Sequence, residues 1–345
     1  MYRVGICGHF GYKKELLNGQ TIKTKILYQE LKKYFGEHAV KIVDTHGWKR
    51  NPIAILIKMI ILVKNCKNII ILPAQNGLKV IAPLFFLLNK IFNKNIHYVV
   101  IGGWLPDFLN NNHKMKIVLR QFKGIYVETN SMKKMLEKMG LSNVYYLPNF
   151  KRLKILDEDE LNIVFEEPYK LCTFSRVLKE KGIEDAIESV KAVNELYGRI
   201  VYTLDIYGQI DGNYKDRFKE LEKNFPSYIS YKGTVDYENS VNVLKNYFAL
   251  LFPTYYEGEG FAGTIIDAYA AGVPVIATDW KYNKEIIKDK QDGLLYDYKN
   301  KNKLKEILTN IIKNPNSIVE MKNNCLKRAK EFTPEVALKA IIMKL

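Results

Sequence analysis

Short apolar runs alternate with longer amphipathic stretches along the first half of the chain. The run at residues 2–7 is followed by a helical pattern over about residues 21–35, with apolar side chains at Ile22, Ile26 and Leu31. Further strand-like runs, separated by helical patterns, lie at residues 40–43, 69–72, 96–101, 125–128 and 144–146. Strands that alternate with helices at this spacing predict a doubly wound parallel sheet.

The second half repeats this pattern after a break. Residues 151–168 are charged and irregular, as expected of an interdomain connection. A helix is predicted at residues 183–197, because its apolar positions share one helical face. Strands are predicted at residues 170–174, 201–207, 229–232, 249–252 and 273–278.

Together these patterns predict an α/β protein with two Rossmann-like, doubly wound parallel-sheet domains that face each other across a cleft. The expected domains are residues 1–155 and 156–330, followed by a C-terminal helix at residues 331–345. Ligands of open α/β sheets bind beyond the carboxyl ends of the strands, so we expect the active site in that cleft.

The composition is that of a folded protein with an excess of positive charge. Of 345 residues, 47% are hydrophobic and 26% charged, and 53 Lys and Arg against 37 Asp and Glu leave a net charge of +16. Such an excess favours an anionic partner. The alternative is a low-GC genome that over-uses Lys and Asn. Because the lysines are dispersed and lack an RNA-binding aromatic signature, we expect no nucleic acid and favour an anionic membrane surface or a nucleotide.

Cysteine and histidine usage predicts neither disulfides nor a metal site. The four cysteines, Cys7, Cys66, Cys172 and Cys325, form no CxxC pair, and we expect no leader before the first strand. Reduced thiols in the cytoplasm are the simple interpretation. The five histidines show no metal-ligand spacing.

Two apolar segments, residues 52–63 and 82–92, are candidates for membrane contact. Each is shorter than the about 20 residues of a bilayer span, and Lys58 interrupts the first. One interpretation is a core helix. The other is an interfacial helix whose Lys58, Lys64 and Lys67 meet anionic headgroups, which would make the protein peripheral at the inner membrane face.

The first strand ends in a glycine-rich turn that differs from the dinucleotide-binding fingerprint. Gly5, Gly8 and Gly11 are spaced Gly-x-x-Gly-x-x-Gly, and Asp44 is the only acidic residue at the end of the second strand. A dehydrogenase is therefore disfavoured. Gly19, just before the next helix, leaves room for a phosphate on the backbone amides, although glycine before a helix is common.

A basic turn follows the strand at residues 170–174. Arg176 comes directly after this strand and Lys181 opens the next helix, so the two side chains can hold a diphosphate between them. The Arg supplies a planar fork and the Lys a point charge. A solvated charged turn is the other interpretation of these residues.

A glycine-rich loop with two acids occupies residues 255–279. The loop precedes a small-residue helix at about residues 264–271, whose amides and dipole attract an anion. Glu259 and Asp267 lie eight positions apart, and we expect them to accept hydrogen bonds from sugar hydroxyls, because a carboxylate next to a phosphate is electrostatically costly. The alternative is a tight turn with solvated acids. The loop glycines are Gly258, Gly260 and Gly263.

This segment resembles the donor-binding signature of retaining glycosyltransferases of the GT-B fold, in particular glycosyltransferase family 4. The matching positions are Glu259, Gly260, Phe261 and Asp267. In that family the first acid approaches the donor sugar and the second the nucleotide ribose. The resemblance covers almost the whole chain: Arg176 and Lys181 are similar to the diphosphate-binding pair of the family. The segments at residues 147–149, 285–287 and 292–295 also match.

Three departures from the family pattern affect the implied site. Asp267 stands where the family usually has Glu, and Ala262 replaces the second Gly of Gly-Phe-Gly. Many relatives carry a His after the fourth strand, where residues 101–107 have none. The acceptor contacts that the resemblance leaves in the first domain are His9, Gly102, Gly103, Trp104 and Asp107.

The resemblance thus implies an enzyme that moves a sugar from a nucleoside-diphosphate sugar to a saccharide acceptor, with retention and without metal or cofactor. A lipid-linked saccharide, as in surface polysaccharide or glycolipid synthesis, is one expected acceptor and a soluble saccharide another. The C-terminal helix is expected to cross back to the first domain, as in relatives. The implied catalytic residues are Glu259, Arg176 and Lys181. The implied donor-binding residues are Gly19, Gly208, Gly260, Phe261, Ala262, Gly263, Thr264 and Asp267.

Two other classes of protein fit parts of the pattern. One is another sugar-nucleotide enzyme of the same fold, such as an epimerase or a phosphorylase; no lysine is positioned for the Schiff-base cofactor of the latter. The other is a non-catalytic basic protein that binds membrane or nucleic acid. Such a module does not need Glu259, Asp267, Arg176 and Lys181 together at strand ends.

Overall fold

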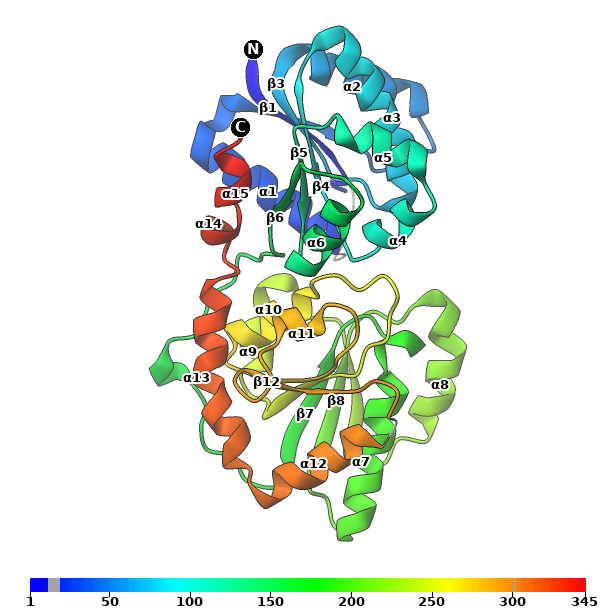
Figure 1. Cartoon of the computed structure of the whole chain (residues 1–345). Helices are drawn as coiled ribbons and strands as arrows, with labels where there is room; N and C mark the ends of the chain where they lie inside the picture. Colours follow the sequence, from blue (N-terminus) through cyan, green and yellow to red (C-terminus); the bar gives the residue numbers. More distant parts are fainter. Residues whose placement is uncertain (12–18, 301) are drawn as a thin grey trace. The chain divides into compact units, whose positions relative to one another are not determined.

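The computed structural model describes residues 1–11, 19–300 and 302–345, which form two compact units (Figure 1). Unit 1 comprises Met1–Arg152 together with Phe332–Leu345, and unit 2 comprises Leu153–Glu331. Each unit is built around its own parallel sheet, so the predicted α/β fold with two parallel sheets is confirmed.

The sheet of unit 1 has six parallel strands among the described residues, in the order β2-β1-β3-β4-β5-β6. Most residues of the inner strands are buried on both faces, which explains their near-continuous apolar sequences. Each strand predicted in this half is present, with ends that shift by up to three residues. The strands are β1 (Tyr2–Gly8), β2 (Val40–Asp44), β3 (Cys66–Ile71), β4 (Asn95–Val99), β5 (Gly124–Val127) and β6 (Val144–Tyr146).

Helices cover both faces of this sheet. In Figure 1, α1, α14 and α15 lie to the left of the sheet and α2, α3 and α5 to its right. The helix α2 begins cleanly because Asn51 accepts a hydrogen bond from the Ala54 amide and Pro52 occupies its first turn. The helices are α1 (Gly19–Phe35), α2 (Pro52–Asn65), α3 (Gln75–Phe92), α4 (Leu105–Asn110), α5 (His113–Arg120), α6 (Asn130–Lys138), α14 (Pro334–Ala337) and α15 (Lys339–Ile342).

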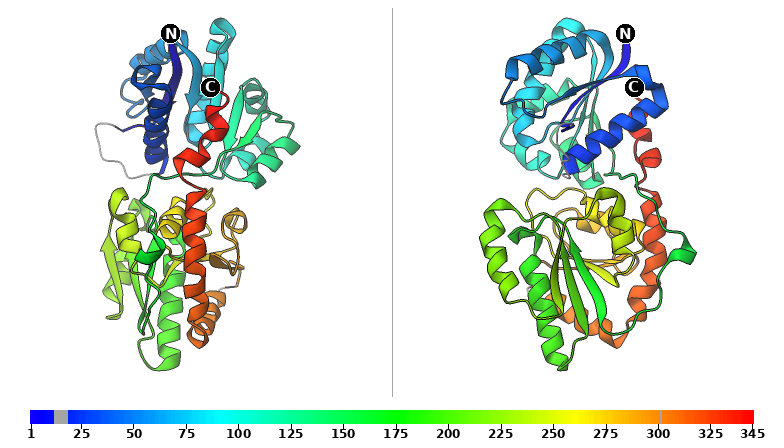
Figure 2. Two further views of the ribbon diagram at one scale, coloured as in Figure 1. Left: turned by 90° about the vertical axis from the view of Figure 1, so that its left-hand side faces the viewer. Right: turned by 180° about the vertical axis from the view of Figure 1, so that it is seen from behind.

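The C-terminal segment is tied to the body of unit 1. The helix α14 packs against α1, and in the view from behind in Figure 2 the red C-terminal helices lie next to α1. Asn68 of β3 donates a hydrogen bond from Nδ2 to the Leu345 carbonyl oxygen at 2.7 Å. This contact fixes the last described residue against the middle of the sheet.

The sheet of unit 2 also has six parallel strands within the described ranges, in the order β12-β11-β10-β7-β8-β9. This is the strand order of the dinucleotide-binding fold, with β7 as the first strand. The sequence pattern did not predict β12, which has four residues and begins with a glycine. The strands are β7 (Tyr169–Phe174), β8 (Tyr202–Tyr207), β9 (Ile229–Gly233), β10 (Ala249–Phe252), β11 (Val275–Thr278) and β12 (Gly293–Tyr296).

A hydrophobic core of unit 2 lies between this sheet and α7 and α12. Alternate residues of β8, namely Tyr202, Leu204 and Ile206, point into that core, whereas the residues between them face the other side of the sheet. The helices are α7 (Ile183–Tyr197), α8 (Lys215–Lys223), α9 (Ser240–Leu244), α10 (Gly263–Ala270), α11 (Asn283–Ile286), α12 (Lys303–Lys313) and α13 (Asn316–Lys330).

The structure also describes the state of the cysteines and bears on metal binding and membrane spans. Cys7, Cys66, Cys172 and Cys325 are buried as free thiols. Over the described ranges, no group of three or more His, Cys, Asp or Glu side chains is arranged to hold a metal ion. None of the helices in these same ranges is both long enough and apolar enough to cross a membrane.

Candidate active site

The topology of unit 2 creates a ligand-binding position between β7 and β10. These strands are neighbours, yet the chain continues from β7 towards β8 and from β10 towards β11, on opposite sides. Because the connections after these two strands run in opposite directions, a crevice is left at the carboxyl ends of the strands. Ligands of doubly wound sheets bind in such a crevice. The loops that follow β7 and β10 are residues 175–182 and 253–262, the segments that carry the predicted donor residues.

Two glycines allow these loops to approach each other. Gly208, after β8, has a φ of +136°, and a Cβ atom there would lie 1.8 Å from the Ser175 carbonyl oxygen. Gly182 has a φ of +71°, and its Cβ would lie 2.1 Å from the Pro253 carbonyl oxygen. Only glycine fits either position, because the backbone of a neighbouring loop occupies the space of a side chain. Gly208 was predicted as a donor-binding residue, and the structure gives it this packing role.

Lys181 and Glu259, which the sequence assigned to separate roles, form a buried ion pair. Lys181 Nζ lies 2.5 Å from Glu259 Oε2, and both side chains are about nine-tenths buried. Thr254 donates a hydrogen bond to the same carboxylate oxygen at 3.0 Å. The pair uses one of the three N–H donors of the ammonium group, so Lys181 keeps the capacity to bind a further acceptor.

Aromatic rings surround the two basic side chains. Lys181 Nζ lies 5.2 Å from the ring centroids of both Phe252 and Tyr256. The Arg176 guanidinium carbon lies 5.5 Å from the centroid of the same Tyr256 ring, and Arg176 is 3.7 Å from Asp211. Tyr256 therefore stands beside both cations and brings them to one locus through cation–π attraction. Arg176 remains half exposed, so it can reorient towards a ligand.

The loop that holds Tyr256 and Glu259 is anchored from the end of β11. Thr278 donates a hydrogen bond from Oγ1 to the Thr254 carbonyl oxygen at 2.5 Å. Trp280 donates from Nε1 to the Tyr256 carbonyl oxygen at 2.9 Å. The sequence pattern assigned no role to Thr254, Thr278 or Trp280. A Thr–Thr pair on adjacent strand ends carries no sequence signal until the strands are known to be neighbours.

The first turn of α10 faces this loop with little side-chain capping. Its N-cap residue, Ala262, has no side chain that can accept a hydrogen bond from the amides of the first turn. Within the described residues the Thr264 hydroxyl is buried without a hydrogen-bond partner. Gly260, Phe261 and Ala262 are buried, and Gly263 is half-buried at the start of the helix. The amides at the start of the helix, the helix dipole and the Thr264 hydroxyl together suit an anion.

Asp267 lies one turn further into α10 and is almost fully buried. Its Oδ1 accepts a hydrogen bond from the Ser240 hydroxyl of α9 at 3.0 Å, and Ser240 Oγ lies 3.0 Å from the Tyr237 carbonyl oxygen. The structure thus gives this predicted ribose contact a partner within the protein, which the sequence did not indicate.

The predicted residues of the first domain lie at the carboxyl edge of the other sheet. His9 follows β1; its Nδ1 lies 2.8 Å from Thr21 Oγ1 and its Nε2 lies 3.1 Å from His46 Nδ1. Burial lowers the pKa of His9, with His46 as the next cause and Asp44 in opposition. The neutral imidazole is therefore favoured near pH 7. The pairing with His46 was not predicted from the sequence.

The remaining residues of this group are spread along the same unit. Gly19 is exposed at the start of α1, in unit 1 rather than with the other predicted donor residues of unit 2. Gly102, with a φ of +82°, and the buried Gly103 follow β4. Trp104 donates a hydrogen bond from Nε1 to the Ile101 carbonyl oxygen at 2.8 Å, and Asp107 is exposed on α4.

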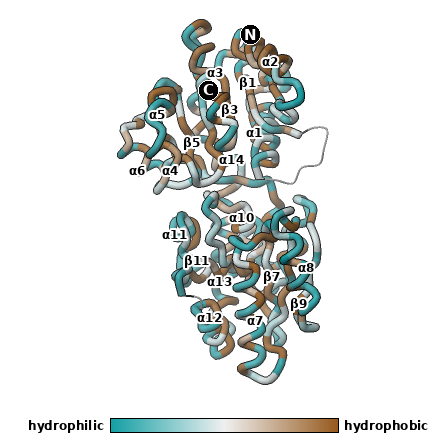
Figure 3. The backbone as a smooth tube through the Cα atoms, turned by 90° about the vertical axis from the view of Figure 1, so that its right-hand side faces the viewer, coloured by the Kyte–Doolittle hydropathy of each residue, from teal (hydrophilic) through white to brown (hydrophobic). Residues whose placement is uncertain are grey.

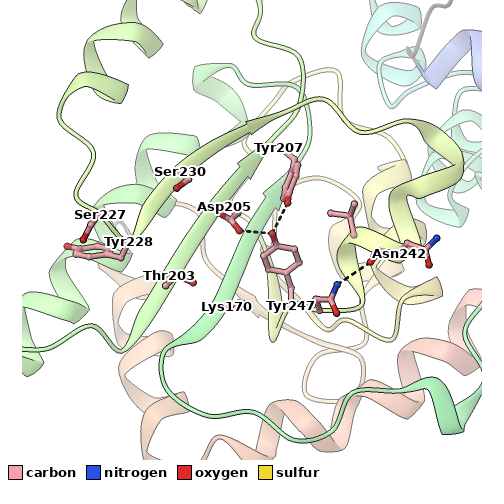
Figure 4. Close-up of a pocket in the computed structure, with 11 residues that line it drawn as sticks. Lys170, Thr203, Asp205, Tyr207, Ser227, Tyr228, Ser230, Asn242 and Tyr247 are labelled. Carbon is pink, nitrogen blue, oxygen red and sulfur yellow. Dashed lines mark hydrogen bonds between the residues drawn. The ribbon is translucent and has the colours of Figure 1, made fainter.

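A separate cavity of 520 Å³ lies on the face of β7, β8 and β9 away from the main core (Figure 4). Tyr247 donates a hydrogen bond to Asp205 at 2.7 Å, and its hydroxyl lies 2.8 Å from that of Tyr207. Burial, followed by these hydrogen bonds, raises the pKa of Tyr247. This cavity runs along the strands, and only Tyr207 among its lining residues adjoins a predicted donor residue, Gly208.

The fold places the chain among GT-B proteins. The structure of Anabaena Alr3699/HepE in complex with UDP superposes with a TM-score of 0.76 over 99% of both chains, at 12% sequence identity. The predicted GT-B fold is therefore confirmed.

The sequence profile of the family described as glycosyl transferases group 1 matches residues 157–332, half of the chain and nearly all of unit 2. The chain belongs to this family. It is 24% identical over 176 residues to an uncharacterized glycosyltransferase, MJ1069, of Methanocaldococcus jannaschii, which covers 50% of this chain and 44% of that protein.

A second relative is the GtfA subunit of the UDP-N-acetylglucosamine–peptide N-acetylglucosaminyltransferase of Streptococcus gordonii. It is 28% identical over 172 residues, which cover 49% of this chain and 33% of that protein. The region in which this chain aligns thus spans less than half the length of each of these curated relatives.

Proposed function

We propose that this protein is a glycosyltransferase that moves a sugar from a nucleoside-diphosphate sugar, with UDP as the nucleotide, to a saccharide hydroxyl. The observation that carries this proposal is the meeting of Arg176, the Lys181–Glu259 pair and the uncapped start of α10 at the crevice between β7 and β10. Cations, the amides at the start of α10 and a carboxylate suit a diphosphate linked to a sugar. The UDP in the HepE structure supports the choice of nucleotide.

In the proposed reaction the bond between the anomeric carbon and the diphosphate oxygen breaks, and its electron pair leaves with the nucleoside diphosphate. The acceptor oxygen forms the new bond to the anomeric carbon, and its proton passes to the departing phosphate or to solvent. Arg176, Lys181 and the amides of residues 260–263 stabilise the charge that grows on the leaving group. Glu259 stays oriented by Lys181 and Thr254 to accept a hydrogen bond from a donor-sugar hydroxyl.

The finer features of the proposal follow from the resemblance to glycosyltransferase family 4. We propose retention of the anomeric configuration, no requirement for a metal, and contact of Asp267 with the ribose. His9, Gly102, Gly103, Trp104 and Asp107 of unit 1 are proposed to bind the acceptor, with Gly19 leaving room for a substrate phosphate. The basic residues of the first domain and its two apolar segments favour a lipid-linked saccharide at the inner membrane face as the acceptor.

A thermal-shift panel followed by a transfer assay tests the donor. UDP and UDP-sugars are expected to raise the Tm of the purified protein, and GDP serves as the control for the base. Transfer is then followed by mass spectrometry with saccharide and extracted lipid-linked acceptors. If no nucleotide raises the Tm and no sugar is transferred, the proposed function is wrong.

The substitution Arg176→Ala tests the diphosphate contact. Removal of one preorganised charge-stabilising donor lowers kcat by about 100- to 1,000-fold, and we expect a loss of that size with little change in Tm. Arg217→Ala is the matched control, because Arg217 is also half exposed in unit 2 but pairs with Glu184. Near-normal transfer by Arg176→Ala would show that the diphosphate lies elsewhere.

A further inference from the structure

Two neighbouring helices of unit 1 carry apolar side chains on their outward faces. On α2, the exposed fractions of Ile53, Ile57 and Ile61 are 71%, 51% and 42%, and on α3 those of Leu87 and Ile91 are 59% and 75%. The two helices pack against each other, so these side chains share one surface. Figure 3 colours long stretches of both helices as hydrophobic.

This arrangement differs from that of an ordinary surface helix. A helix that covers a sheet normally turns its apolar stripe inward and polar residues outward. Here both faces are apolar: Met59, Leu62 and Val63 of α2 are buried against the sheet, while the isoleucines point away from it. Contiguous exposed apolar patches of this kind mark interaction surfaces.

The charge around this patch has a single sign. The sequence has no Asp or Glu between Asp44 and Asp107, whereas this interval carries eight Lys and Arg residues. The basic residues of the interval are Lys49, Arg50, Lys58, Lys64, Lys67, Lys79, Lys90 and Lys94. The adjoining α5 continues the pattern with an exposed Ile117 between basic residues and without an acid. Carboxylates from the helices that form the surface therefore do not offset its positive charge.

We propose that this surface, the α2–α3 face, binds the interfacial region of an anionic membrane. Its members are Ile53, Leu56, Ile57, Ile61, Val80, Leu87 and Ile91 with Lys58, Lys64 and Lys90. Apolar side chains enter the boundary between headgroups and acyl chains, and lysines meet the acidic headgroups. Nucleic acid offers no partner for seven apolar side chains, and a second copy of this chain presents the same positive charge.

Vesicle co-sedimentation tests this surface independently of catalysis. The full-length protein is mixed with phosphatidylcholine vesicles that contain either about 30–40% phosphatidylglycerol or none. The total lipid concentration is titrated up to about 1 mM. We expect binding to the anionic vesicles and at least tenfold weaker binding to the neutral ones. Binding is also expected to weaken at high salt, because the ionic attraction is screened.

Two sets of variants separate the apolar and the charged contributions. Lys58→Gln, Lys64→Gln and Lys90→Gln combined are expected to weaken binding roughly 100-fold, at about fivefold per lysine. Ile57→Gln, Ile61→Gln and Leu87→Gln combined are expected to weaken it at least as much, since each loses a buried apolar side chain.

Matched controls come from exposed residues of unit 2. Leu196→Gln removes an apolar side chain of similar exposure, and Lys219→Gln with Lys223→Gln removes charge from α8. These variants are expected to bind vesicles like the wild type. All variants should keep the wild-type Tm and UDP response, which separates failure of this proposal from failure of the proposed function.

Three outcomes overturn the proposal. One is equal binding to neutral and anionic vesicles, and another is unchanged binding by both α2–α3 variants. The third is a dimer, detected by light scattering without lipid, that the apolar variant alone dissociates; that result assigns the surface to a second copy of the chain.

Discussion

The Lys181–Glu259 pair makes a prediction in which stability and nucleotide binding change in opposite directions. Glu259→Gln removes the negative charge but keeps a side chain of the same shape that can still accept a hydrogen bond from Lys181. The ammonium group, about nine-tenths buried, then has no charged partner from Glu259. A diphosphate that reaches Lys181 can replace the missing charge, so the variant should respond more strongly to UDP than the wild type does.

The size of the effect follows from the burial of the pair. Removing one partner of a buried ion pair costs about 3–5 kcal/mol, and the hydrogen bond that the amide retains to a charged group offsets about 1.5–3 kcal/mol of this. The free energy of unfolding should therefore fall by about 2 kcal/mol. For a unit of this size each 1 kcal/mol lowers the Tm by about 2–4 °C, so we expect a decrease of about 4–8 °C.

Differential scanning fluorimetry with and without saturating UDP measures both quantities. We expect Glu259→Gln to regain at least half of its lost Tm when UDP is added, while its sugar-transfer rate stays low. Glu257→Gln is the matched control: Glu257 lies two residues away and pairs with Lys281 at 2.9 Å, but it is largely exposed. An exposed ion pair contributes less than about 1 kcal/mol, so this control should change little. An equal UDP shift in Glu259→Gln and the wild type would refute a contact between Lys181 and the nucleotide.

Three further predictions concern single residues. Gly208→Ala should lower the free energy of unfolding by about 1–3 kcal/mol and weaken UDP binding, because its Cβ meets the Ser175 carbonyl oxygen. Gly212→Ala, with open space around it, should change neither, and equal Tm values for the two variants would contradict this. Burial, followed by the charges of Lys123 and Lys344, lowers the pKa of His97 from 6.5 to about 4. Between these pH values the unfolded chain binds a proton on His97 that the folded chain does not. Stability should therefore fall between pH 6.5 and 4, by about 3 kcal/mol in total, and urea titrations of His97→Gln should lack that slope. Burial lowers the pKa of Lys322 from 10.5 to about 8, so Lys322→Met should raise the Tm at pH 7, and the wild type alone should gain stability between pH 8 and 10.5.

Much of the fold could be predicted from the sequence because buried parallel strands leave strong apolar runs. The strands at Val144–Tyr146 and Ala249–Phe252 and the helix at Ile183–Tyr197 have the bounds that the pattern predicts. The pattern missed Gly293–Tyr296, because a four-residue edge strand that begins with glycine resembles a turn. Strand order was not predictable, since period and propensity contain no information about which strands are neighbours.

The candidate site shows the same limit at the level of side chains. Residue types at strand ends pointed to Arg176, Lys181 and Glu259, but not to the ion pair between the last two. That pair depends on β7 and β10 being adjacent, which brings together residues 78 positions apart. The supporting hydrogen bond of Asp267 with Ser240 likewise joins separate elements, α10 and α9, whose proximity no local pattern indicates.

The two sheets offer different chemistry at equivalent positions. In each sheet, the connections after two neighbouring strands run in opposite directions and leave a crevice at the carboxyl ends of the strands. These strands are β7 and β10 in unit 2, and β1 and β3 in unit 1. The first crevice holds two cations and a helix N-terminus, which favour a diphosphate. Beside the second lie His9 and His46, and burial lowers the pKa of His9, so that the neutral ring is favoured near pH 7. A neutral imidazole accepts or donates a hydrogen bond without attracting a phosphate strongly, which suits a sugar hydroxyl. We therefore expect His9→Ala to raise the KM for the acceptor and leave UDP binding unchanged. Arg176→Ala, in contrast, should lower kcat because it removes a contact to the diphosphate of the donor.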